Sequence, residues 1–302
     1  MNQNRSRHKR SLILFLFCAI VFISCNDAKE DDKDDLIENT DTVKTAVLNI
    51  DGELFSIPSP IQTALLIQKS GIDYNKNVLS ASNKVNTFPT DYSRALNLGV
   101  FGADLGYVSL YNQTQDALGY LAAIKQLSDK LGLTAAFDAG TMERIKNNIT
   151  NKDSMMVLVG IAYRGSDSYL KNNQRNDISS LILAGGWVEG VYFSAEAYKL
   201  KPNAVIKQRI AEQKQALNSL VKILGNNSSP EVAELTTMMS DLAKVYEGIQ
   251  FKYNFVKPET DSIKKVTYIN STTEVMVSEE QITQIISKLG EIRSKIVNTT
   301  KS

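Results

Sequence analysis

The 302-residue sequence predicts a mainly α-helical protein, a bundle of about eight helices in one domain with a small antiparallel β accessory. Two stretches, residues 96–111 and 181–198, have helical length and almost no charge, whereas a surface helix carries a charged face opposite its apolar one. In most of the remaining sequence, apolar residues recur at intervals of three and four residues, which is typical of amphipathic helices. We therefore expect two helices covered on all sides, with the others packed around them.

The chain begins with the pattern of a secretory signal. Residues 1–10 hold four basic residues and no acidic one, and residues 11–24 form a mostly apolar run that is too short to span a membrane. The segment Phe22-Ile23-Ser24-Cys25 resembles a bacterial lipobox, although Phe22 stands where leucine is commonest. This resemblance runs from Met1 to Cys25 and implies cleavage after Ser24 and a lipid on Cys25. The alternative is an ordinary signal peptide with an unmodified cysteine.

Residues 25–44 are predicted to be the lipidated cysteine followed by a flexible acidic tether. From residue 26 to residue 44 there are eight acidic residues, three lysines and few apolar side chains, so the segment lacks the apolar area that folding requires. The acidic run resembles export signals of surface lipoproteins in Gram-negative bacteria, and Asn26 resembles outer-membrane sorting. The expected location is the outer membrane, facing the periplasm or the cell surface. A plain solvated spacer is the alternative.

Cleavage would change the composition of the protein. Removal of residues 1–24 takes away four basic residues, so the net charge changes from +1 to −3. It also removes His8 and Cys18, which leaves the mature chain with no histidine and only one cysteine. No disulfide can then form within the chain, and stability has to come from the core.

The folded body is expected to span residues 45–302. Asp51-Gly52 lies between two apolar-rich runs, which predicts a hairpin over residues 46–57. Ser59-Pro60-Ile61-Gln62 then has the pattern of a helix start, and that helix should end at Ser70. The polar residues 72–89 predict a loop with short turns.

The helix over residues 96–111 presents three faces when it is turned by about 100° per residue. One face is large and apolar, formed by Leu98, Phe101, Leu105 and Val108. A second is built of small residues, Gly99, Gly102, Ala103 and Gly106. Glycine costs up to about 1 kcal/mol in a helix interior, so the small face predicts close approach of another backbone.

The third face of this helix is polar and carries Asp104, Tyr107 and Tyr111. A carboxylate in a covered helix has to be paired, hydrogen-bonded or directed into a wet cavity. Two interpretations remain open. Asp104 either accepts hydrogen bonds from neighbours and serves the structure, or it lines a polar pocket that binds a ligand.

The stretch 181–198 repeats this pattern further along the chain. Four identities align, Leu96, Leu98, Tyr107 and Ser109 with Leu181, Leu183, Tyr192 and Ser194. Asp104 aligns with Glu189, and Glu189, Tyr192 and Glu196 repeat the polar spacing. The pattern favours an internal duplication with repeat units around residues 96–132 and 181–225. Chance similarity between two buried helices is the alternative.

Apolar spacing and helix-start signals predict the remaining helices, over residues 114–131, 141–150, 153–173, 203–224, 229–249 and 278–296. Ser278 and Gln281 form a capping-box pattern at the start of the last helix. Three short runs, residues 253–256, 266–269 and 274–277, indicate strands. They are candidates for pairing with the N-terminal hairpin.

The residue inventory narrows the chemistry. Without histidine, the Ser-His-Asp and Cys-His catalytic groups and His-ligated metal sites are excluded. The sequence has no phosphate-binding glycine loop and no calcium-loop motif, so we expect no cofactor and no metal. No basic stripe stands out, which argues against nucleic acid as a partner.

Two functions of different class follow. In the first, a membrane-anchored, non-enzymatic module binds an envelope protein, a glycan or a small molecule, through candidates Asp104, Tyr107, Tyr111, Glu189, Tyr192 and Glu196. In the second, Asp104 and Glu189 act as the acid/base pair of a glycosidase-like helical hydrolase. The second requires the two carboxyl groups to lie about 5–10 Å apart across an open cleft.

Overall fold

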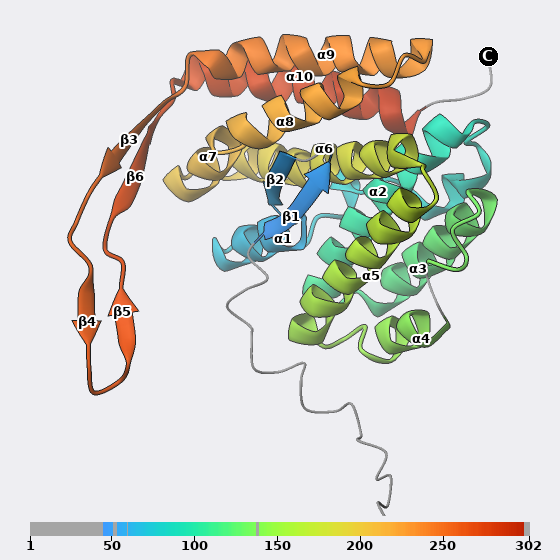
Figure 1. The fold of residues 1–302 in the computed structure, drawn as a ribbon, viewed down its shortest axis with the longest axis horizontal. Helices are drawn as coiled ribbons and strands as arrows, with labels where there is room; N and C mark the ends of the chain where they lie inside the picture. Colours follow the sequence, from blue (N-terminus) through green and yellow to red (C-terminus); the bar gives the residue numbers. More distant parts are fainter. Residues whose placement is uncertain (1–44, 51–52, 59, 137–138, 299–302) are drawn as a thin grey trace, which may run out of the picture. The chain divides into compact units, whose positions relative to one another are not determined.

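Helices α2 (Asp91–Leu110) and α6 (Asn176–Leu200) lie at the centre of the fold, and most of their residues are buried. The computed structural model describes residues 45–50, 53–58, 60–136 and 139–298. These residues form a mainly α-helical protein with a small β accessory, which confirms the predicted fold class (Figure 1). The predicted signal segment, the lipidation site Cys25 and the tether lie outside the described residues.

Eight further α-helices of the described chain surround the central pair: α1 (Pro60–Lys69), α3 (Thr114–Lys130), α4 (Ala139–Asn147), α5 (Lys152–Asn172), α7 (Ala204–Ala211), α8 (Lys214–Gly225), α9 (Pro230–Glu247) and α10 (Glu279–Val297). Helices α1, α5 and α10 contact both central helices, and α3 contacts α2. Helix α9 packs against α8 and α10 (Figure 1). The central helices are thus covered from several sides, as the lack of charge in them predicted.

The two central helices cross so closely that their backbones touch. A Cβ atom built on Gly99 would lie 2.0 Å from a carbonyl oxygen of α6, and one built on Gly185 would lie 1.9 Å from a carbonyl oxygen of α2. No side chain fits at either position, which confirms the predicted close approach at Gly99. On the same predicted small-residue face, Gly106 faces a side chain of α1, whereas a Cβ on Gly102 would meet no atom within 4 Å.

The helix predicted over residues 203–224 is in fact two helices, α7 and α8. The chain turns between them at Gln213, whose side chain is buried. Its Oε1 accepts a hydrogen bond from Nε1 of Trp187 at 3.1 Å, and its Nε2 donates to the carbonyl oxygen of Arg209 at 3.0 Å. Because apolar spacing continues through the turn, periodicity alone could not show the break.

The β accessory consists of three antiparallel two-stranded ribbons among the described residues: β1 (Thr45–Ile50) with β2 (Glu53–Pro58), β3 (Gln250–Asn254) with β6 (Thr272–Met276), and β4 (Glu259–Asp261) with β5 (Val266–Tyr268). The predicted N-terminal hairpin is confirmed. The suggested pairing of the later strands with that hairpin is wrong, because they pair with one another between α9 and α10 (Figure 1). Local pairing closes a much shorter loop and so costs less chain entropy.

The polar segment 72–89 forms short turns, as predicted, including the 3-10 helices η1 (Lys76–Val78) and η2 (Ser82–Asn86). Tyrosine hydroxyls attach this segment to the helices. Tyr111 donates to one of its carbonyl oxygens at 2.7 Å, and Tyr120 donates to another at 2.6 Å. These hydrogen bonds attach the segment to α3 and to the residue that ends α2.

Among the described helices, α6 alone is long and apolar enough to cross a membrane by length and composition. In the fold, 94% of its most apolar window is buried by other parts of the protein. Its apolar character is accounted for by its place in the core.

Candidate functional site

Asp104 and Glu189, the two carboxyl groups singled out by the sequence, meet at the interface between α2 and α6. Both side chains have 0% exposed surface, and the carboxyl groups are close enough for each to shift the pKa of the other. These are the positions that correspond in the suggested duplication, which itself stays a prediction. Such a pair can exist in the core only if its charge is balanced.

Arg293 on α10 provides that balance. Its Nε donates to Oε2 of Glu189 and its Nη2 donates to Oε1, each at 2.8 Å, so the carboxylate is held by both oxygens. Nη2 also donates to the carbonyl oxygen of Val78 at 2.8 Å. The guanidinium carbon lies 4.1 Å from the centre of the Tyr192 ring, within cation–π distance. Arg293 thereby joins α10, α6 and the end of η1.

Of the two carboxyl groups, Asp104 is the one that holds a proton. Burial, and then the negative charge of Glu189, raises the pKa of Asp104 well above its usual range. Burial also raises the pKa of Glu189, but the charge and hydrogen bonds of Arg293 oppose this rise. The charge of Arg293 and the backbone N–H of Ser80 oppose the rise in the pKa of Asp104 without reversing it. We infer that Asp104 is protonated and donates its hydrogen bond to the ionised Glu189.

The raised pKa predicts how stability depends on pH. Folded Asp104 keeps a proton that the unfolded chain releases above about pH 3.9, so its contribution is complete below that pH and is lost as the pH rises through the folded pKa. Asp104→Asn keeps a donor for Glu189 and cannot ionise. We expect this variant to gain stability relative to the wild type as the pH rises above about 4. Urea unfolding at several pH values measures the difference, and parallel pH profiles would show that Asp104 is ionised in the fold.

This geometry does not favour the hydrolase alternative. The hypothesis required an open cleft between the two carboxyl groups, and the structure instead brings them into direct interaction. It places them in the core, where neither has exposed surface, and not across an open cleft. Arg293 occupies both oxygens of Glu189. A substrate would have to displace a buried ion pair to reach them.

Tyr107 and Tyr111, the other candidates on α2, form hydrogen bonds to the segment 72–89. The Tyr107 hydroxyl accepts a hydrogen bond from the backbone N–H of Asn75 at 3.1 Å, and the Tyr111 hydroxyl donates to the carbonyl oxygen of Ile72. The two rings pack together at 4.9 Å between centres. Neither residue lines the two pockets described below.

Tyr192 and Glu196 do reach a pocket. It lies between α6 and α10, has a volume of about 410 Å³, and is lined on the α6 side by these two residues and Lys199. Lys199 donates to Glu196 at 2.7 Å. The α10 side is formed by Ile286, Ser287, Gly290, Arg293, Ser294, Val297 and Asn298. Arg293 therefore binds the buried Glu189 carboxylate and also lines this pocket.

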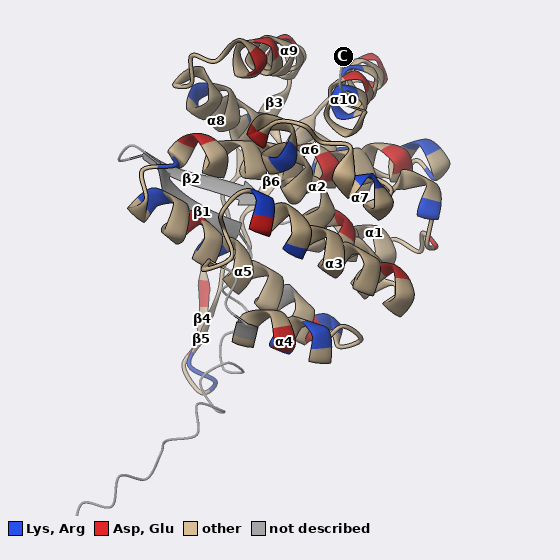
Figure 2. Cartoon of the chain, turned by 90° about the vertical axis from the view of Figure 1, so that its right-hand side faces the viewer, with Lys and Arg blue, Asp and Glu red and all other residues tan. Residues whose placement is uncertain are grey.

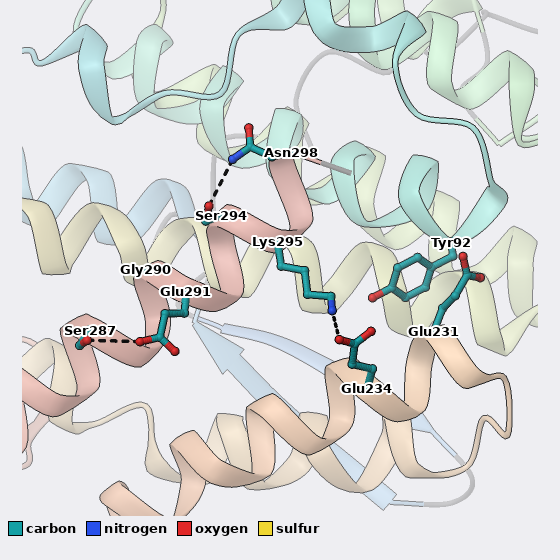
Figure 3. Close-up of a pocket in the computed structure, with 9 residues that line it drawn as sticks. All are labelled: Tyr92, Glu231, Glu234, Ser287, Gly290, Glu291, Ser294, Lys295 and Asn298. Carbon is teal, nitrogen blue, oxygen red and sulfur yellow. Dashed lines mark hydrogen bonds and ion pairs between the residues drawn. The ribbon is translucent and has the colours of Figure 1, made fainter. Parts of the chain in front are cut away.

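A second pocket of about 860 Å³ lies on the other side of α10, facing α9 and the start of α2 (Figure 3). Its walls include Tyr92, Glu231, Glu234, Glu291 and Lys295, and Lys295 reaches across to bond Glu234. The two pockets share four residues at α10, Ser287, Gly290, Ser294 and Asn298. We call the combined surface the α10 groove.

Arg293 and the α10 groove were missed by the sequence interpretation. A signal for each was present. Arg293 stands between Ile292 and Ile296, both core residues of α10, where a charged residue needs a buried partner. Gly290 lies in the middle of the same helix, where glycine is destabilising relative to alanine, so another reason for a small residue was to be expected there.

Comparisons with protein-family models, with curated proteins and with solved structures find no match to this chain. What the fold and the site define is a class of architecture: an α-helical bundle with a buried Asp–Glu–Arg network at its centre and a polar groove beside it.

Proposed function

We propose that this protein is a lipid-anchored lipoprotein of a bacterial envelope whose helical domain is a non-enzymatic binding module. Its ligand site is the α10 groove, and the ligand is a polar molecule that is neutral or carries an amine, such as a segment of a glycan. The anchor rests on the lipobox-like sequence that ends at Cys25.

The charge balance of the groove carries the ligand part of this proposal. Each cation that lines it is already paired with a carboxylate: Lys199 with Glu196, Arg293 with Glu189 and Lys295 with Glu234. Glu231 and Glu291 add further negative charge to the walls. An anionic ligand would meet paired cations and unfavourable carboxylates, whereas hydroxyl or amine groups would find acceptors.

The shape and composition of the groove agree with this ligand class. Both pocket volumes fall within the range of about 300–1,000 Å³ found for small-molecule sites. The shared floor consists of two serines, an asparagine and Gly290, and a Cβ on Gly290 would meet open space. Acidic and basic residues are interspersed along the outer helices in the view of Figure 2. Hydrogen bonding, and not one strong field, is therefore the expected mode of recognition.

The ligand is tested with the purified lipoprotein and immobilised oligosaccharides of three kinds: neutral, amine-bearing and uronic-acid-bearing. We expect binding to the neutral or amine-bearing kinds. Gly290→Leu should weaken that binding at least tenfold, because its side chain fills the floor of the groove. Gly225→Leu is the matched control, since a Cβ there also meets open space and Gly225 lines neither pocket. A preference for uronic acids, or undiminished binding by Gly290→Leu, contradicts the proposal.

The anchor is tested separately. Metabolic labelling with a fatty-acid analogue should mark the wild-type protein in membranes, and Cys25→Ser should lose both the label and the membrane association. Protease treatment of intact cells then distinguishes a cell-surface from a periplasmic domain. Full labelling of Cys25→Ser would show that the lipobox interpretation is wrong.

A further inference from the structure

A long β-ribbon joins α9 to α10, and it is the most exposed part of the described chain. Strands β3 and β6 form its base and β4 and β5 form its tip (Figure 1). Ser271 connects the two parts, because its hydroxyl accepts from the backbone N–H of Val256 and donates to the carbonyl oxygen of the same residue, each at 3.0 Å. The ribbon is thus continuous from Gln250 to Met276.

One face of the base of the ribbon is mainly apolar, and the other is polar apart from Met276, which pairs with Gln250. Phe251 pairs with Val275 and Tyr253 with Thr273, so these side chains share a face. Lys252 pairs with Glu274 on the opposite face. Beyond the base, large apolar side chains continue towards the tip, and Phe255 is 71% exposed, Ile269 74% and Ile263 95%.

Val275 packs the base of the ribbon against the core, and the more exposed remainder favours a partner. An isolated two-stranded hairpin is marginally stable in water, and both outer edges of this one have unpaired backbone groups. Four of its exposed side chains are aromatic, Phe251, Tyr253, Phe255 and Tyr268, and each can bury about 150–250 Å². An exposed apolar strip of this extent marks an interaction surface.

We infer that the partner is a second copy of this chain, with the two ribbons packed antiparallel through their apolar faces. Two-fold symmetry then places the tip of each ribbon against the base of the other. The tip carries Lys264, which pairs with Asp261 at 3.7 Å, and Lys265, and exposed Glu247 and Glu280 flank the base. The antiparallel arrangement brings these opposite charges together at both ends, whereas a parallel one would place lysines against lysines.

The distribution of apolar residues also distinguishes this partner from a lipid surface. They are spread along the whole ribbon, so insertion of the tip into a membrane would leave Phe251, Tyr253 and Met276 at the base exposed. The tip turn is also capped by the carboxylate of Asp261, which accepts from the backbone N–H groups of Ile263 and Lys264 at 3.0 Å each. A matching ribbon covers the whole strip.

Cysteine crosslinking in the full lipoprotein tests the arrangement. Phe255 lies near the middle of the ribbon, close to the expected two-fold axis, whereas Ile263 lies at the tip, far from its own copy. Phe255→Cys should therefore form a covalent dimer under mild oxidation and Ile263→Cys should not. Crosslinking at Ile263 and not at Phe255, or at neither position, overturns the inference.

Mass measurements on the detergent-solubilised protein provide a second readout. The wild type should be a dimer, and Tyr253→Lys on the apolar face should shift the equilibrium towards monomer at least tenfold. Thr272→Lys, on the polar face of the same base, is the matched control and should remain dimeric. Charge reversal at the tip by Lys265→Glu should also weaken the dimer, and mixing with a Glu247→Lys/Glu280→Lys chain should restore it. A wild type that is monomeric at all concentrations, or one that binds neutral lipid vesicles through Tyr253, overturns the inference.

Discussion

Replacement of Gly185 by alanine should destabilise the protein by roughly 3 kcal/mol or more, the largest effect that we expect from one added methyl group. The new Cβ would lie 1.9 Å from the carbonyl oxygen of Leu96. Neither atom can move without displacing the backbone of a central helix. The helices would have to separate, and the buried Asp104 and Glu189 would separate with them.

Gly102→Ala is the matched control for this prediction, because it adds the same methyl group to α2 at a position where nothing lies within 4 Å. Alanine has the better helix propensity, so we expect a gain of up to about 1 kcal/mol. Urea denaturation of both variants measures the contrast. If Gly102→Ala and Gly185→Ala have equal effects, the closeness of the crossing is not what requires glycine.

Replacement of Arg293 by methionine should cost about 3–5 kcal/mol, because it leaves the ionised Glu189 buried without its positive counter-charge. Because methionine fills a similar space, the loss of unfolding free energy comes mainly from the missing charge and less from changed packing. The bonds to Glu189 and the contact with Tyr192 disappear together, and the wall of the α10 groove should loosen as well.

A double variant separates charge from shape at this site. Glu189→Gln/Arg293→Met removes both charges and keeps an oxygen that can accept from Asp104. We expect it to recover most of the stability lost in Arg293→Met, as neutral replacements of buried ion pairs often do. Equilibrium unfolding of the two single variants and the double variant gives the coupling energy. Additive losses would show that Arg293 and Glu189 do not act as a pair.

The helical architecture could be predicted because each helix has a local signal. The capping boxes at Thr90–Ser93 and Ser278–Gln281, the apolar spacing and the uncharged stretches all act within a few residues of one another. The second of these caps was predicted, and the central position of α2 and α6 followed from their lack of charge. The break at Gln213 was not predictable in this way, since its cause is a hydrogen bond from Trp187 on another helix.

The part of the candidate site that was predicted also depended on local sequence signals. Asp104 and Glu189 stood out as charges in covered helices, and the structure places them together. Tyr107 and Tyr111 looked equally polar in sequence, but their hydroxyls bond a loop that precedes α2 in the chain and is distant from them in sequence. Tyr192 and Glu196 reach a pocket only because α10 returns to lie beside α6.

By itself, the sequence determined that this chain is helical, which two helices are covered, and which carboxyl groups had to find a buried partner. These properties depend on the burial preference of each side chain and on spacing along one helix. Only the tertiary structure decided which partner each group found, namely Arg293 for Glu189, a second carboxyl group for Asp104 and a neighbouring backbone for Gly185. The physical reason is that each of these contacts joins helices that are far apart in the sequence. Their geometry follows from how whole helices pack, and no local pattern encodes it.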